Sequence, residues 1–193
     1  MFEIFNRINF VDIFLIFVGI RIFYISFEMG LPVELFKLLG IIFSTYISLH
    51  YYTALSDLIQ NSFIPKQMPL EFLDFLVFMV LALGGYLGFI VLRNIFYRFL
   101  KLDASPRLSQ IGGLILGLGR IYFTTGIFIY ILMISSVKYL NESVKHSYFA
   151  SRSVSISADT YAWLWNNIVE KFSTNEKFNP TVTEVMDRFK PQK

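Results

Sequence analysis

The stretch LEFLDFLVFMVLALGGYLGFIVL, residues 70–92, carries no charged side chain after Asp74. A bilayer's hydrocarbon core is about 30 Å thick and an α-helix rises 1.5 Å per residue, so about 20 apolar residues cross it. Three further stretches reach that length, at residues 8–27, 31–52 and 111–137. The sequence therefore predicts an all-α membrane protein, with four transmembrane helices in residues 1–137 and a tail in residues 138–193.

Composition agrees with a chain whose main partner is the lipid bilayer. Hydrophobic residues make up 55% of the 193 and charged residues 16%, whereas soluble domains carry about 25% charged residues. The net charge of +3 is too small to indicate nucleic-acid binding. There is no cysteine, which excludes disulfides, thiol nucleophiles and cysteine-based metal sites.

The first apolar stretch is expected to be a retained helix. A signal peptide has an apolar run of about 7–15 residues followed by small residues at a cleavage site. Here the run is longer and ends in bulky residues, FYISFE at 23–28.

The connections between the four stretches differ in length. Gly30 and Pro32 predict a tight turn, because glycine can end a helix in the left-handed conformation and proline suits a first helical turn. Residues 53–69 and 93–110 are longer connections; residues 94–100 of the second could remain helical, and Pro106 is expected to interrupt it before the fourth helix.

The tail contains two short amphipathic helices. After a Ser-rich strip at 147–160, apolar residues recur with helical spacing, at Tyr161, Leu164, Trp165, Ile168, Val169 and Phe172. This face could lie on the membrane surface or pack against a partner protein or a second copy of the chain. A last helix is expected at residues 181–189, with Thr181 and Glu184 in a capping box.

Basic residues set the expected orientation, because Lys and Arg accumulate in cytoplasmic loops. The third connection carries the densest cluster, which is Arg93, Arg98, Lys101 and Arg107. The cations on the opposite side are spaced more widely along the sequence, and they are Arg7, Lys66, Lys138, Lys145 and Arg152. The margin is small, and the cluster favours both termini lying outside the cytoplasm.

Ionisable residues inside predicted membrane helices are functional-site hypotheses, because each costs at least a few kcal/mol to bury there. They are Asp12, Arg21, Glu34, Lys37, His50 and Arg120. Arg21, Glu34, Lys37 and Arg120 lie at similar depth and predict an ion-pair cluster in which Glu34 neutralises Arg120 or Arg21. Asp12 is nine residues from Arg21, so the two point to opposite faces. Such a cluster either fixes helix register or moves a proton, ion or solute.

Glycines four residues apart predict contact faces, because helices in lipid associate through close packing. Gly84 and Gly88 form one pair, and Gly113 and Gly117 form another. We expect the third and fourth helices to pack together through them; a self-association face, giving a homo-oligomer, is the alternative.

Several motifs, in this order and spacing, resemble the colicin V production protein (CvpA) family. They are Val11-Asp12-Ile13, the turn from Met29 to Glu34, His50-Tyr51-Tyr52, and Gly113-xxx-Gly117-xx-Arg120. The chain departs from the family pattern at Met29, where the family has Arg, at Ile121, where it has Gly, and at Ser109-Gln110, where it often has Asp-Arg.

The resemblance implies a four-helix protein of the bacterial cytoplasmic (inner) membrane. The family is linked to production or export of the toxin colicin V and to envelope stress tolerance. Some relatives fuse the same helices to an extracytoplasmic serine protease domain, which agrees with an extracytoplasmic tail.

No catalytic residue, cofactor or metal site is expected. His50 and His146 lack zinc-type spacing, and no phosphate loop, nucleotide fingerprint or nucleophile elbow occurs. We therefore expect a non-enzymatic accessory protein that works with other membrane or envelope proteins. A small oligomeric transporter or channel that uses Glu34 and Arg120 is the alternative.

Overall fold

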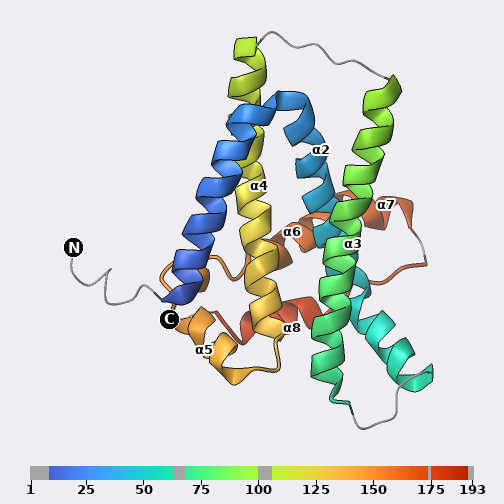
Figure 1. Cartoon of the computed structure of the whole chain (residues 1–193). Helices are drawn as coiled ribbons and strands as arrows, with labels where there is room; N and C mark the ends of the chain where they lie inside the picture. Colours follow the sequence, from blue (N-terminus) through green and yellow to red (C-terminus); the bar gives the residue numbers. More distant parts are fainter. Residues whose placement is uncertain (1–8, 63–67, 100–105, 174, 191–193) are drawn as a thin grey trace.

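The computed structural model describes residues 9–62, 68–99, 106–173 and 175–190. Throughout these ranges the regular structure is helical (Figure 1). Three long helices, α2 (Phe10–Ser62), α3 (Leu70–Phe99) and α4 (Pro106–Ile134), run side by side. Within the described ranges these three are the helices long and apolar enough to cross a membrane. The chain is thus an all-helical protein with membrane-type helices.

Helix α2 is bent back on itself at Gly30, whose φ of 73° and ψ of 176° are not helical. We call residues 10–29 the first arm and residues 31–62 the second arm; Figure 1 shows them running in opposite directions. A single glycine at positive φ is enough to reverse the chain, so the two arms follow each other with no separate loop between them. The predicted turn is present, and it is shorter than a separate loop.

The helices are longer than their apolar stretches. The second arm continues to Ser62, where the sequence predicts an end at 52, and α4 runs from Pro106 to Ile134, where it predicts a helix over 111–137. Helix α3 continues past the apolar stretch to Phe99, as the helical alternative for residues 94–100 predicts. A helix can continue into polar residues beyond its apolar run, and a hydropathy pattern marks only the apolar run. Pro106 begins α4 rather than separating it from a loop, because its missing N–H is no loss in a first turn.

Some predicted features fall outside the described residues. The structure does not describe Arg7, Lys66 or Lys101, or the side chain of Arg98. The basic connection between α3 and α4 can therefore be placed only through its flanking residues Arg93 and Arg107.

Helix α2 contacts both other long helices extensively. Helix α4 packs against both arms of α2, and α3 packs against the second arm. The most completely buried side chains include Leu49, Tyr52, Phe78, Ile129 and Tyr130. The phenolic oxygens of Tyr52 and Tyr130 are 3.0 Å apart. Elsewhere large apolar side chains point outward, as expected for lipid-facing helices.

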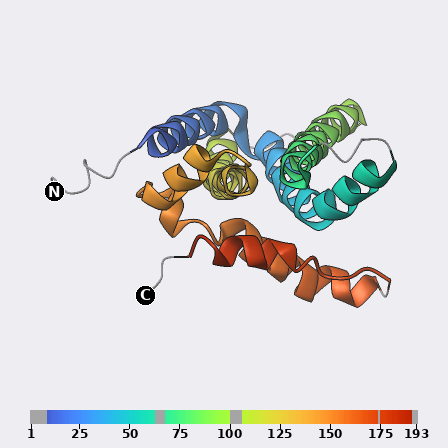
Figure 2. The same ribbon diagram turned by 90° about the horizontal axis from the view of Figure 1, so that it is seen from below.

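The tail forms a second layer beside the three helices (Figure 2). It comprises α5 (Lys138–His146), η1 (Ala150–Arg152), α6 (Ile156–Leu164), a π-helical turn η2 (Trp165–Val169), α7 (Glu170–Phe172) and α8 (Thr181–Asp187). It lies toward the end of α2 and α4 that is opposite the Gly30 bend.

Three expectations for the tail need correction. The strip predicted as a loop holds η1 and the start of α6. Tyr161 and Trp165 are buried in the chain's own fold, against α2, whereas Phe172 is 86% exposed. No capping box forms at α8, because Pro180 is the N-cap and the Glu184 amide donates to the Pro180 carbonyl at 3.2 Å.

Candidate functional site

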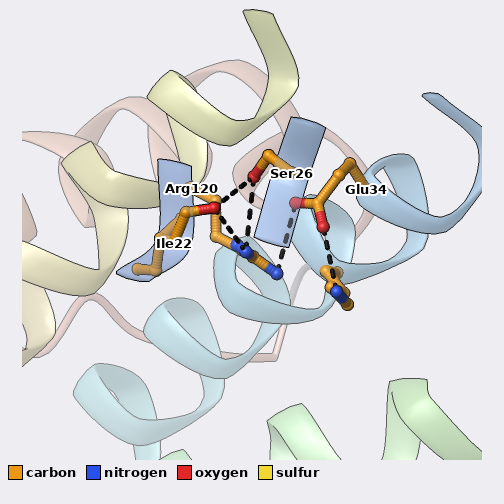
Figure 3. A network of polar contacts seen from close by, with 5 residues as sticks. Ile22, Ser26, Glu34 and Arg120 are labelled. Atoms are coloured by element: carbon orange, nitrogen blue, oxygen red, sulfur yellow. Dashed lines mark hydrogen bonds and ion pairs between the residues drawn. The ribbon is translucent and has the colours of Figure 1, made fainter. Parts of the chain in front are cut away.

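An ion-pair cluster lies between the two arms of α2 and α4 (Figure 3). Arg120 Nη1 is 3.2 Å from Glu34 Oε2, and Lys37 Nζ is 2.9 Å from Glu34 Oε1. Glu34 is fully buried and Arg120 is 5% exposed. Glu34 follows the bend by one turn, so the reversal at Gly30 is what turns it toward α4.

Arg120 also binds the first arm, so that one guanidinium joins three helical segments. Its Nη2 lies 3.4 Å from the Ile22 carbonyl oxygen and 3.4 Å from Ser26 Oγ. The Ser26 hydroxyl in turn donates to the Ile22 carbonyl at 2.7 Å. Hydrogen bonds to charged groups contribute about 1.5–3 kcal/mol each, which makes this guanidinium a strong link between the arms.

The glycines of α4 allow this approach. A Cβ at Gly113 would lie 2.6 Å from the Ser26 carbonyl oxygen and 3.0 Å from backbone atoms of Gly30, and a Cβ at Gly117 would meet the Ser26 side chain. These two predicted packing glycines therefore face the first arm of α2 rather than α3.

Gly84 and Gly88 do not act as packing glycines within the chain. A Cβ at either position would meet nothing within 4 Å. The α3 glycine in close contact is Gly85, where a Cβ would lie 3.0 Å from Ser44 Cα of the second arm. The predicted pairing of α3 with α4 through these glycines is thus wrong. Where α3 and α4 do meet, the contact is aromatic, with the Phe78 and Tyr130 ring centroids 5.2 Å apart. The self-association alternative stays a prediction.

Ser109 supports the bend. Its hydroxyl accepts a hydrogen bond from the Leu31 amide at 3.3 Å. The amide that follows a left-handed glycine has no helical partner, and the Ser109 side chain supplies one. Sequence reasoning noted Ser109 only as a departure from the family pattern, and it overlooked Ile22 and Ser26; the one available signal was a serine within an apolar stretch.

Asp12 is not part of the ion-pair cluster. It is fully buried near the opposite end of the first arm, where its carboxylate binds the tail. The Ser147 hydroxyl donates to Oδ1 at 2.6 Å, the Phe149 amide to Oδ1 at 2.8 Å and the Tyr148 amide to Oδ2 at 3.1 Å. Asp12 therefore anchors the segment that follows α5.

His50 is a second anchor for the tail. Its Nδ1 is 2.8 Å from the Tyr161 hydroxyl, and its Nε2 is 3.3 Å from a carboxylate oxygen of Glu176. The Asn179 amide donates to the same Tyr161 hydroxyl at 2.9 Å. Burial raises the pKa of Tyr161 to about 12, so the phenol is neutral at physiological pH.

A cleft of about 610 Å³ opens between both arms of α2, α3 and α4. Arg21, Lys37 and Arg120 lie in its wall together with apolar side chains. Arg21 thus shares the cleft with the predicted cluster but makes no ion pair with Glu34. In the part of the chain that the structure describes, no three His, Asp or Glu side chains gather as a metal site would require.

Comparison with known proteins identifies the family. The family described as colicin V production protein matches residues 11–158, which include Asp12, the Gly30 bend, the α4 glycines, Arg120 and the tail segment bound by Asp12. No curated protein and no solved structure matches the chain. Because the matched range covers more than half of the 193 residues, this chain belongs to the colicin V production protein family.

Proposed function

We propose that this chain crosses the bacterial cytoplasmic membrane four times and is a non-enzymatic accessory protein that anchors or assembles a secretion or envelope complex. Each arm of α2 and each of α3 and α4 has at least 20 residues, which corresponds to about 30 Å of helix and so to one bilayer crossing. Membership of the colicin V production protein family supports the proposed role in toxin production or envelope maintenance.

The same arrangement supports the proposed orientation. The Gly30 bend and the start of α4 lie at one end, while the start of α2 and the tail lie toward the other. Arg93 and Arg107 flank the connection at the bend end, and basic connections are typical of the cytoplasmic side. We therefore place both termini outside the cytoplasm, which a reporter fused after Lys193 and active only outside the cytoplasm would test.

The observation that favours an accessory role over a transport role is that Glu34 and Arg120 are buried and bound only by other groups of the described fold. Both side chains are buried, and the remaining contacts of the guanidinium go to Ile22 and Ser26 of the first arm. An ion pair between α4 and the second arm that also binds a carbonyl and a hydroxyl of the first arm is suited to fixing helix positions, which an assembly platform requires.

One observation favours a transporter or channel as the second candidate. The cleft brings Arg120 into contact with a space between the helices. Four helices rarely enclose a pathway alone, so this role requires oligomerisation, for which the open Gly84 and Gly88 face is available.

Glu34→Met combined with Arg120→Met separates the two roles, with both changes made in a Lys37→Met background because Lys37 also pairs with Glu34. Replacing both members of a buried ion pair by apolar residues of similar volume is often neutral for stability, whereas removing one member leaves an unpaired buried charge. If the pair only holds the helices, the double variant supports toxin export or envelope stress survival in a deletion strain, while Glu34→Met alone accumulates poorly.

Liposome flux provides the second readout. Purified wild-type protein should conduct protons or ions no faster than protein-free liposomes. A wild-type flux that disappears in the folded double variant, together with lost complementation, would instead establish the transport role.

A further inference from the structure

The cleft between the helices has walls suited to hydrocarbon. Phe14 of the first arm, Ile41 of the second arm, Met79 of α3 and Phe128 of α4 each contribute to its lining. Its volume of about 610 Å³ falls within the range of about 300–1,000 Å³ that is typical of small-molecule binding sites. Since the lining comes from every long helical segment, the cleft is a product of the whole fold.

The charged residues in this lining are all basic. They are Arg21, Lys37 and Arg120, and the lining contains no carboxylate. Glu34, just behind, pairs with both Lys37 and Arg120. Three formal positive charges therefore face one negative charge, which leaves an excess of positive charge at one side of an apolar space.

Two basic groups retain unused hydrogen-bonding capacity. Arg21 is exposed and makes no hydrogen bond or ion pair with any described residue. Arg120 is buried, with 6% of its side chain exposed, and its Nε has no acceptor among the described residues. A buried donor without an acceptor is unfavourable, and Arg120 adds to the positive charge along the cleft wall.

We propose that the cleft binds an anionic lipid, with its phosphate on Arg21 and Lys37 and its acyl chains along the apolar walls. Basic pockets between membrane helices are suited to acidic headgroups. A free inorganic anion would leave the apolar walls uncovered. An apolar helix of another protein would bury Arg21 without a partner, which membrane helices avoid.

The depth of the cations is compatible with a headgroup. Lys37 is seven residues beyond Gly30, which at 1.5 Å per residue places its Cα about 10 Å from the bend. Lys and Arg side chains extend toward the interface while their stems stay in the apolar region. The phosphate therefore lies toward the bend end, and the chains run toward Phe14 and Phe128.

This site goes beyond the proposed function, and its test does not depend on which accessory or transport role is correct. The full chain in uncharged detergent is titrated with phosphatidylglycerol, with phosphatidylcholine of the same acyl chains, and with inorganic phosphate, and bound lipid is counted by native mass spectrometry. We expect phosphatidylglycerol to bind at least about tenfold more tightly than phosphatidylcholine, because the cleft's surplus charge acts on the anionic headgroup.

Arg21→Gln is the decisive variant, because Arg21 has no partner among the described residues whose loss could unfold the chain. It should weaken phosphatidylglycerol binding by about tenfold, the effect of losing one charge-assisted contact. Arg21→Lys should restore most of the affinity, and Lys37→Gln should weaken it as well. Arg107→Gln, which removes an exposed cation of α4 outside the cleft lining, is the matched control and should change affinity less than twofold.

Three results would overturn the proposal. Equal affinity for the two lipids would show that charge does not select the ligand. An equal loss in Arg107→Gln and Arg21→Gln would place lipid at the general surface. Displacement of phosphatidylglycerol by millimolar inorganic phosphate would make this a site for a free anion.

Discussion

Replacing Asp12 should detach the start of the tail from the helices. Its carboxylate accepts hydrogen bonds from the Ser147 hydroxyl and from the Tyr148 and Phe149 amides, at 2.6, 3.1 and 2.8 Å. It also accepts one from the Asn9 amide, at 3.0 Å. Asp12 is fully buried, so solvent does not weaken these contacts in the folded chain.

The magnitude follows from the three donors that belong to the tail. Hydrogen bonds to a charged group contribute about 1.5–3 kcal/mol each. Their simple sum overestimates the loss, because the freed amides bind water once the segment opens. We therefore expect Asp12→Ala to destabilise the docked segment by about 3–5 kcal/mol. Asp12→Asn should cost about 2 kcal/mol, because its amide group places a donor against one of the same N–H groups.

Hydrogen exchange measures this opening directly. Since about 1.4 kcal/mol corresponds to a tenfold change, peptides covering residues 147–153 should exchange at least about a hundredfold faster in Asp12→Ala. Peptides from α3 should be unaffected. The matched control is Asp57→Ala, which removes an exposed carboxylate from the same helix and should leave the exchange within about threefold.

Two results would refute this reasoning. Exchange of residues 147–153 within threefold of wild type in Asp12→Ala would mean that the carboxylate does not hold the tail. Equal acceleration throughout α3 and α4 would mean that Asp12 stabilises the whole fold rather than tail docking.

Two further predictions concern packing and the second tail anchor. Gly113→Ala should lower the thermal midpoint of unfolding in detergent, because the added Cβ would meet backbone of the first arm at an overpacking cost of about 1–3 kcal/mol. Gly84→Ala, where the added Cβ faces open space, should leave the midpoint unchanged. A larger loss in Gly84→Ala than in Gly113→Ala would contradict the described packing. Tyr161→Phe should speed exchange of α8, because its hydroxyl joins His50 to the Asn179 amide. The pKa of Tyr161 is raised from 10 to about 12. The neutral phenol therefore stabilises docking of the tail fully below pH 10, and this stabilisation is lost as the pH rises through 12. Hydrogen exchange of α8, corrected for intrinsic rates, should show that loss in the wild type and not in Tyr161→Phe.

Charge and glycine positions predicted part of the site from sequence. The carboxylate of Glu34 among several cations at similar depth indicated an ion pair, and the structure places Arg120 and Lys37 on it. Which cation would pair with Glu34 was open, because Arg21 and Arg120 are equally basic. The close approach of Gly113 and Gly117 to Ser26 and Gly30 selects Arg120.

The assignments that failed depend on contacts between distant segments. Asp12 lay in an apolar helix and was a hypothesis for a site inside the membrane, but three of its partners are 135 to 137 residues away in the tail. The apolar residues Tyr161 and Trp165 suggested a membrane surface or a partner protein, yet they pack on His50 of the same chain. Periodicity shows that a face must be covered and does not show what covers it.

By itself, the sequence determined the helical, membrane-type character of the chain, because a run of about 20 apolar residues cannot leave its backbone polar groups unpaired in lipid. It also determined the bend, since Gly30 can adopt a positive φ without strain. Only the tertiary structure decided which helices touch, which cation neutralises Glu34, and that a basic cleft remains between the arms. These depend on distances between residues far apart in the chain, and helix periodicity carries no information about such distances.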